Sequence, residues 1–205
     1  MIDPEKRPVL IVVAGPNGSG KTSVTSKILH HQWLENSVYI NPDIVAQERF
    51  GDWNSKDAIM KAVKYCEEWR ETCLKERKSL IFETVMSADD KVDYIERALM
   101  HGFFVRVFFV CTSSPTINAS RIASRVMKGG HDVPITKVIS RYQKSILNCK
   151  HIADKVDRLY LYDNSIENNE AQLLIRLSKG HIVKQYATTL PEWANIIVND
   201  CFTTD

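Results

Sequence analysis

The sequence lacks the features that define several specialised classes of protein. None of its apolar runs reaches the ~18 residues that a membrane-spanning helix needs, and acids precede the short apolar run near its start. We therefore expect neither a signal peptide nor a membrane span. Charge is nearly balanced, with 27 Lys and Arg against 25 Asp and Glu and a formal net charge of +2. This balance predicts no general attraction to nucleic acid or membrane, so any basic surface must be local.

Cysteine is sparse as well. The five cysteines form neither a CxxC pair nor a dense framework, which suits a reducing compartment better than secretion. We expect a cytoplasmic protein. Cys66 and Cys73 stand seven residues apart on one stripe of a predicted helix, and we interpret them as core residues rather than metal ligands.

Repeats, low-complexity segments and obvious linkers are also missing. With 205 residues, the chain is most simply one domain spanning residues 1–205, although two domains of about 100 residues each remain possible.

The order of apolar segments predicts an α/β fold. Short apolar runs at residues 9–15, 37–41, 79–84, 103–112 and 157–165 predict five strands, and amphipathic segments between them predict helices. This alternation is typical of a doubly wound, mostly parallel five-stranded sheet, but it does not reveal the strand order. Beyond the fifth strand, residues 170–200 predict a hairpin that turns at Lys179-Gly180, followed by a short helix.

The strongest motif is "GPNGSGKT", which matches the phosphate-binding P-loop pattern G-x-x-x-x-G-K-[ST] without a mismatch. A buried strand precedes it and a helix follows it, as that loop requires. Glycines let backbone N–H groups surround phosphate oxygens at the positive end of the helix. The lysine should reach the β- and γ-phosphates, and the threonine hydroxyl should bind Mg²⁺. The predicted nucleotide-binding residues are Gly15, Pro16, Asn17, Gly18, Ser19, Gly20, Lys21 and Thr22.

Two acids follow neighbouring strands of the predicted sheet. Asp43 comes directly after the second strand, and Glu83 closes the third. Ligands bind at the carboxyl ends of the strands in such sheets, so both acids should face the phosphate loop. Phosphate transfer to an alcohol needs a carboxylate that accepts the hydroxyl proton. We assign this role to Asp43, and we expect Glu83 to orient the acceptor or the water of the metal. The alternative for Asp43 is a plain helix N-terminal acid, and for Glu83 a structural role.

Two smaller hydroxyl residues, Thr84 and Ser87, follow the same strand and could bind the acceptor.

Basic residues recur on two helices after the fourth strand, within a predicted lid at about residues 115–150. Arg121 and Arg125 lie four residues apart on one helix, and Lys137, Arg141 and Lys144 share a face of the next. Arginines brought over a transferring phosphate stabilise its charge, and we favour Arg125 and Arg141 for that role. The alternative is a solvated basic face. The glycine pair between the helices would allow a hinge, and His131 beside it is more consistent with fixing the loop than with catalysis.

Five motifs in this order carry a resemblance to a known family: "GPNGSGKT", "NPDIVA", "FETVMS", "RVMKGGHDVP…ISRY" and "DNS". From about Val9 to Ser165 the sequence resembles the zeta-toxin family of P-loop kinases, and particularly its stand-alone members. The resemblance implies an ATP-dependent, Mg²⁺-requiring kinase. It also implies an acceptor such as UDP-N-acetylglucosamine, phosphorylated on the 3′-hydroxyl of its sugar.

The resemblance assigns roles to the residues above. Lys21 and Thr22 would hold the phosphates and Mg²⁺, and Asp43 would be the base. Glu83 with Thr84 would contact the acceptor.

For the arginines, the resemblance implies that Arg125 and Arg141 clamp the phosphates, and Arg121 could replace one of them. Residues 163–165 would lie near the nucleotide base.

Other functions remain open from the residues alone. The acceptor could be another alcohol, such as an antibiotic, a nucleoside or a free sugar, because the same loop, acid and lid serve any of them. The protein could instead be a nucleotide-binding interaction module without phosphotransfer. No fused antitoxin helix bundle is evident. Nucleic acid binding through the lid is not expected, since Tyr142 is the one aromatic residue among its basic positions.

Overall fold

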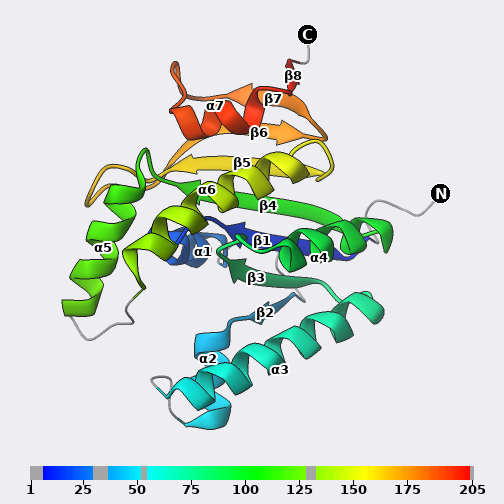
Figure 1. Cartoon of the computed structure of the whole chain (residues 1–205). Helices are drawn as coiled ribbons and strands as arrows, with labels where there is room; N and C mark the ends of the chain where they lie inside the picture. The colour runs from blue at the N-terminus through cyan, green and yellow to red at the C-terminus, as the bar shows by residue number, and fades with distance from the viewer. Residues whose placement is uncertain (1–6, 30–36, 52–54, 128–132, 204–205) are drawn as a thin grey trace.

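The computed structural model describes residues 7–29, 37–51, 55–127 and 133–203. His131 and the glycine pair at 129–130 lie outside these ranges. Strands and helices alternate as predicted through the first two-thirds of the chain (Figure 1). The elements in chain order are β1 (Val9–Ala14), α1 (Lys21–Ile28), β2 (Val38–Ile40), α2 (Pro42–Phe50), α3 (Lys56–Lys75), β3 (Leu80–Thr84), α4 (Asp89–Met100), β4 (Phe104–Cys111), α5 (Pro115–Met127), α6 (Ile135–Ile152), β5 (Arg158–Asp163), β6 (Gln172–Ser178), β7 (His181–Gln185), α7 (Glu192–Val198) and β8 (Phe202–Thr203).

All strands belong to one sheet, in the order β2-β3-β1-β4-β5-β6-β7-β8. The first five are parallel, as predicted. The predicted C-terminal hairpin also forms, with Lys179 and Gly180 both at positive φ in its turn. It does not stand apart, however. The antiparallel strands β6 and β7 extend the sheet beyond β5, and the two-residue β8 pairs with β7, so the sheet has eight strands rather than five.

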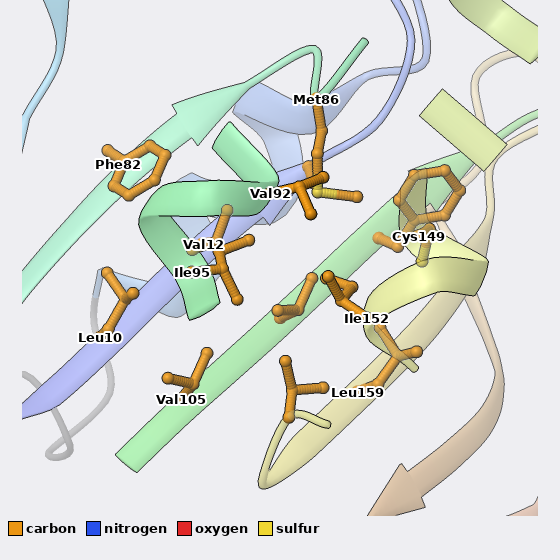
Figure 2. Close-up of a cluster of buried hydrophobic side chains, with 14 of the residues drawn as sticks. Leu10, Val12, Phe82, Met86, Val92, Ile95, Val105, Cys149, Ile152 and Leu159 are labelled. Atoms are coloured by element: carbon orange, nitrogen blue, oxygen red, sulfur yellow. The ribbon is translucent and has the colours of Figure 1, made fainter. Parts of the chain in front are cut away.

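The two faces of the sheet are covered unequally. Figure 1 shows α4, α6 and α7 in front of the sheet and α1 behind it. The main core lies on the front face, where buried side chains of α3, α4, α6 and α7 pack on the strands. Figure 2 shows part of this cluster, with Val92 and Ile95 of α4 and Ile152 of α6 over Val12 and Val105. Burial of these aliphatic side chains is the main stabilising term of such a fold.

A smaller cluster lies on the opposite face. Val24 and Ile28 of α1 pack there against β1, β3 and β4, with Phe108 and Tyr160 at its edge. The cysteines expected in the core are both buried, since Cys66 and Cys73 of α3 have no exposed surface.

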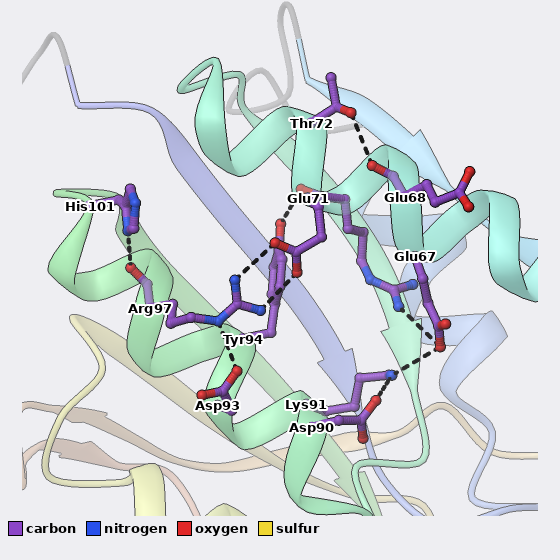
Figure 3. Close-up of polar contacts among 11 residues, drawn as sticks. Glu67, Glu68, Glu71, Thr72, Asp90, Lys91, Asp93, Tyr94, Arg97 and His101 are labelled. Carbon is purple, nitrogen blue, oxygen red and sulfur yellow. Dashed lines mark hydrogen bonds and ion pairs between the residues drawn. The ribbon is translucent and has the colours of Figure 1, made fainter.

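Helices α3 and α4 are tied together by polar contacts (Figure 3). The Arg97 guanidinium donates two hydrogen bonds to the Glu71 carboxylate, at 2.7 and 2.9 Å, and a third to Asp93. The Tyr94 hydroxyl donates to the carbonyl oxygen of Arg70 at 2.8 Å. A bidentate pair fixes the mutual orientation of two helices better than a single contact.

One helix was not predicted as an element. α2 begins immediately after β2, with Pro42 in its first turn and Asn41 as its N-cap. Proline suits that position because its missing N–H would be unpaired there anyway. None of the helices in the described part of the chain is long and apolar enough to cross a membrane.

Candidate active site

The phosphate loop joins β1 to α1 at the carboxyl end of the parallel strands. Gly20, with φ at 88°, caps α1, which begins at Lys21. The Gly15 N–H donates to the carbonyl oxygen of Thr84 at 3.2 Å, so the loop starts against the end of β3. Gly15 also has positive φ, and a Cβ there would overlap the carbonyl oxygen of Val110. These two positions therefore require glycine.

Two asparagines brace the loop from outside. Asn118 of α5 donates from its amide to the carbonyl oxygen of Asn17 at 2.6 Å. Asn164, just after β5, donates to that of Ser19 at 2.8 Å. Sequence reasoning missed Asn118. The available signal was its position four residues before Ile122 on the buried face of α5, where it has no exposed surface. A buried amide at such a position must find partners.

The side chain of Lys21 folds back over the phosphate loop. Its ammonium group donates to the carbonyl oxygens of Gly15 and Pro16, at 2.8 and 2.9 Å. The pKa of Lys21 is lowered to about 8, mainly by burial; the charge of Glu83 opposes this shift and that of Arg125 adds to it. The Lys21 ammonium thus donates to two neutral acceptors, in a site where burial disfavours the charged form. An anionic ligand in the loop would stabilise the charged form and raise the pKa of Lys21 again.

A hydrogen-bonded chain connects the loop to β2 through Glu83. The pairing of Val13 with Glu83 puts this acid beside the end of β1. One of its carboxylate oxygens lies 3.4 Å from the Thr22 hydroxyl, and the other accepts from the Tyr39 hydroxyl at 2.9 Å. The Asn41 amide donates to that same hydroxyl at 2.8 Å. Tyr39 was not among the predicted site residues, because nothing in its own strand marks its distant partner.

Asp43 lies just after the end of β2, the strand next to β3, in the first turn of α2. Its backbone N–H donates to the Asn41 side chain at 2.9 Å, and its carboxylate is exposed. Burial raises the pKa of Tyr39, and the charges of Glu83 and Asp43 raise it further. Both acids therefore lie close enough to the Tyr39 phenol to act on it. The structure brings Glu83 to the loop and leaves the Asp43 side chain exposed in the first turn of α2.

The two hydroxyl residues after β3 differ in their surroundings. Thr84 is buried, and its hydroxyl accepts a hydrogen bond from the N–H of Met86. Ser87 lines an open pocket of ≈ 400 Å³ between the end of β3 and α6. The pocket is lined by Ser87, Ala88, Thr136, Lys137, Ser140, Arg141 and Lys144.

The three arginines named from the sequence lie on two helices, Arg121 and Arg125 on α5 and Arg141 on α6. Arg141 of α6 donates to the Asn17 side chain at 3.5 Å, so it touches the phosphate loop directly. Arg125 of α5 is close enough to lower the pKa of Lys21. Arg121 and Arg125 both line a second pocket, of ≈ 560 Å³, to which Ser165 and Glu167 also contribute.

The first part of α6 lines the pocket that contains Ser87, and the middle of the helix is anchored on the sheet. The Tyr142 hydroxyl donates to the carbonyl oxygen of Thr112 at 2.6 Å, and the Ser145 hydroxyl donates to that of Val85. The helix that carries Arg141 is thereby attached to the ends of both β3 and β4.

The donors near the loop fit Mg²⁺. Within the described ranges, no group of three or more His, Cys, Asp or Glu side chains could hold a metal ion. Mg²⁺ differs from most protein-bound metals because it keeps several waters and binds through one or two protein oxygens plus substrate phosphates. The Thr22 hydroxyl and the Glu83 carboxylate, 3.4 Å apart, supply such a donor pair.

The sheet order, the glycine-rich loop and the lysine within it define a P-loop fold with its phosphate site at the strand ends. The profile of the zeta toxin family matches residues 2–175. The chain therefore belongs to the zeta toxin family.

Several solved structures share this fold. AvrRxo1-ORF1 in complex with AvrRxo1-ORF2 superposes with a TM-score of 0.63 at 16% identity, over 86% of this chain and 60% of that one. A crystal form of that complex with ATP gives 0.64 at 15% identity, over 96% and 64%. This chain thus spans less than two-thirds of AvrRxo1-ORF1.

A third structure comes from the PezAT chromosomal toxin-antitoxin system of Streptococcus pneumoniae. It has a TM-score of 0.57 at 17% identity, over 82% of this chain and 70% of that one. A comparison with curated protein sequences finds no match.

Proposed function

We propose that this protein is an ATP-dependent kinase that transfers the γ-phosphate of ATP to a hydroxyl group of a UDP-sugar such as UDP-N-acetylglucosamine. The observation that carries the proposal is the meeting of three groups at one edge of the sheet. They are a complete phosphate loop, the Thr22–Glu83 donor pair beside it, and the exposed Asp43 at the adjacent strand end.

The nucleotide side of the site supports ATP as the phosphate donor. The loop and the start of α1 offer backbone N–H groups to phosphate oxygens. We assign the ribose and base to the pocket lined by Arg121 and Ser165, and we assign Arg125, whose charge acts on Lys21, to the phosphates. AvrRxo1-ORF1, which shares the fold, has been crystallised with ATP.

The acceptor side supports an anionic alcohol. The pocket against α6 has three cations, Lys137, Arg141 and Lys144, and three hydroxyl groups, and its lining contains no carboxylate. Cations of this density suit an acceptor that carries phosphate, because Lys and Arg bind phosphate oxygens through charge-assisted hydrogen bonds. The hydroxyls suit a sugar. A UDP-sugar combines both features, whereas a neutral sugar or a cationic antibiotic would leave the positive charge uncompensated.

The reaction divides among these residues as follows. The oxygen of the acceptor hydroxyl forms a bond to the γ-phosphorus while Asp43 accepts the proton of that hydroxyl. The bond from the γ-phosphorus to the bridging oxygen breaks, and ADP leaves with that electron pair. Lys21, Arg125 and Arg141 stabilise the charge spread over the γ-phosphate oxygens. Mg²⁺, held at Thr22 and Glu83, would neutralise part of the phosphate charge.

The test is a phosphotransfer assay followed by mass spectrometry. Wild-type protein and Asp43→Asn receive ATP, Mg²⁺ and one acceptor at a time: UDP-N-acetylglucosamine, free N-acetylglucosamine, uridine or a neutral antibiotic. We expect one added phosphate on the UDP-sugar with the wild type and none with the variant, and the free sugar should react poorly. Phosphate on a neutral acceptor alone would refute the UDP-sugar assignment. ATP binding without transfer to any acceptor would instead indicate an interaction module.

A further inference from the structure

The chain leaves the sheet after β3 through a turn centred on Met86. The φ of Met86 is 54°, in the left-handed region that strains any residue with a Cβ. Its side chain is buried in the main core together with Val92 (Figure 2). A strained backbone of this kind persists where the surrounding structure holds it in place. The contacts of the turn should therefore show what holds it.

Three hydrogen bonds from side chains fix the turn. The Thr84 hydroxyl accepts from the N–H of Met86 at 3.0 Å. The other two bonds come from α6, where the Ser145 hydroxyl donates to the carbonyl oxygen of Val85. One turn further along α6, the Asn148 amide donates to the carbonyl oxygen of Met86 at 3.0 Å. Residues three apart share a face of a helix, so a single face of α6 holds both carbonyl groups.

The left-handed conformation of Met86 makes this double contact possible. In an extended strand, neighbouring carbonyl groups point in opposite directions, and one helix could not reach both. Here the carbonyl groups of Val85 and Met86 both point to α6. Ser87 follows immediately, and it lines the open pocket of ≈ 400 Å³ that we assign to the acceptor. The turn therefore sets the direction in which the chain enters the wall of that pocket.

The two bonds from α6 also join the two walls of the acceptor pocket. Residues 87–88, directly after the turn, form one wall, and side chains from residues 136–144 of α6 form the other. Ser145 and Asn148 continue the same helix directly beyond its wall. The separation of the walls therefore depends on how firmly α6 holds the Met86 turn.

The phosphate side of the site has supports of its own. Glu83 is held by the pairing of β3 with β1, where it lies opposite Val13. The N–H of Gly15 donates to the carbonyl oxygen of Thr84, which also precedes the turn. Loosening the turn should thus alter the acceptor side and leave the ATP side in place.

We propose that Ser145 and Asn148 are positioning residues for the acceptor. They hold the Met86 turn, and through it they hold the wall formed by residues 87–88 at a fixed distance from α6. This inference rests on the proposed function, because it takes the pocket against α6 as the acceptor site. It adds the residues that set the dimensions of that site.

The experiment compares Asn148→Ala and Ser145→Ala with the wild-type protein and with Tyr94→Phe as a matched control. Each variant loses one side-chain donor to a backbone carbonyl. In the control the carbonyl is that of Arg70, and neither control residue lines the pocket. Phosphotransfer kinetics give the KM for UDP-N-acetylglucosamine, and titration gives the ATP dissociation constant. Hydrogen exchange followed by mass spectrometry reports on residues 84–88, and thermal melting checks that every variant folds.

We expect both α6 variants to raise the KM for the UDP-sugar at least about fivefold, because each loses one of the two bonds that hold the wall. The ATP dissociation constant should stay within about twofold of the wild-type value, since the phosphate loop does not depend on the turn. Hydrogen exchange at residues 84–88 should become faster. Tyr94→Phe should lower the melting temperature by a similar amount while its KM and the exchange at the turn match those of the wild type.

An unchanged KM in both α6 variants, or an equal rise in Tyr94→Phe, would overturn the inference. A parallel loss of ATP affinity would overturn it too, because that result indicates a general defect. Failure of the proposed function gives a different result, since the wild-type protein itself would then leave the UDP-sugar unphosphorylated. In that case the KM comparison uses the acceptor that the wild type does phosphorylate. Without any acceptor, hydrogen exchange decides, and wild-type exchange at the turn in both α6 variants would refute the inference.

Discussion

Lys21 gives the sharpest prediction, because its charge depends on whether the phosphate loop is filled. In the structure its ammonium donates to the carbonyl oxygens of Gly15 and Pro16, and its pKa is lowered to about 8, mainly by burial. ATP phosphates would stabilise the charged form and raise that pKa again. Binding is thus linked to protonation of Lys21.

The sign and size of the effect follow directly. Below pH 8 the empty protein already carries the Lys21 charge, and ATP affinity should be independent of this group. Above pH 8 a proton must be taken up on binding, so the affinity should fall. With a pKa of about 8, roughly one-tenth of the lysine is charged at pH 9, which predicts about a tenfold weaker affinity at pH 9 than at pH 7.

The assay is calorimetric titration with ATP and Mg²⁺ from pH 7 to pH 9, in buffers of different ionisation enthalpy so that proton uptake is measured directly. Lys21→Met serves as the control, because it removes the titrating group while keeping most of the apolar stem. The variant should bind more weakly than the wild type at pH 7, and its affinity should vary little with pH. A wild-type profile as flat as that of Lys21→Met, with no proton uptake, would refute the reasoning.

Four further outcomes are expected. Asp43→Asn should lower turnover by about 10²-fold or more while the ATP dissociation constant stays within about twofold, measured by single-turnover transfer and by titration. Glu83→Gln should raise the Mg²⁺ concentration needed for half-maximal rate, whereas Asp43→Asn should leave it unchanged. Tyr39→Phe should lower turnover by about tenfold through loss of the Glu83 contact, with little change in melting temperature. Asn118→Ala should destabilise the protein by about 1–3 kcal/mol in a denaturant titration and should weaken ATP binding, because it leaves a carbonyl of the loop unpaired; unchanged stability would mean that water replaces the amide.

The parallel half of the fold could be predicted because its signals are local. A strand buried on both faces is a nearly continuous apolar run, and the sequences of β1 and β4 show such runs without any information about their partner strands. The phosphate loop is equally local, since its eight residues carry both the backbone conformation and the chemistry. α2 was missed because it follows β2 after a single residue and is only nine residues long, too short for a clear apolar period.

Long-range contacts account for the other differences. The hairpin was predicted, but its addition to the sheet depends on β6 finding the edge of β5. The same holds for two residues of the site. Tyr39 meets Glu83 across 44 residues, and Asn118 meets Asn17 across 101, so neither has a marker in its own segment.

The strand order puts the two acids of the proposed site at different distances from the phosphate loop along the sheet. The order β2-β3-β1 makes β3 the direct neighbour of the strand that leads into the phosphate loop, and Val13 pairs with Glu83. Glu83 therefore ends beside Thr22, where a metal-holding acid is useful, and β4 on the other side of β1 needs no acid at its end. β2 lies one strand further out. Asp43 follows it into α2, where its side chain is exposed, and we propose that the acceptor hydroxyl meets it there. The proposed reaction needs one carboxylate for the metal and another for the proton, and we assign these roles to Glu83 and Asp43 at two adjacent strand ends.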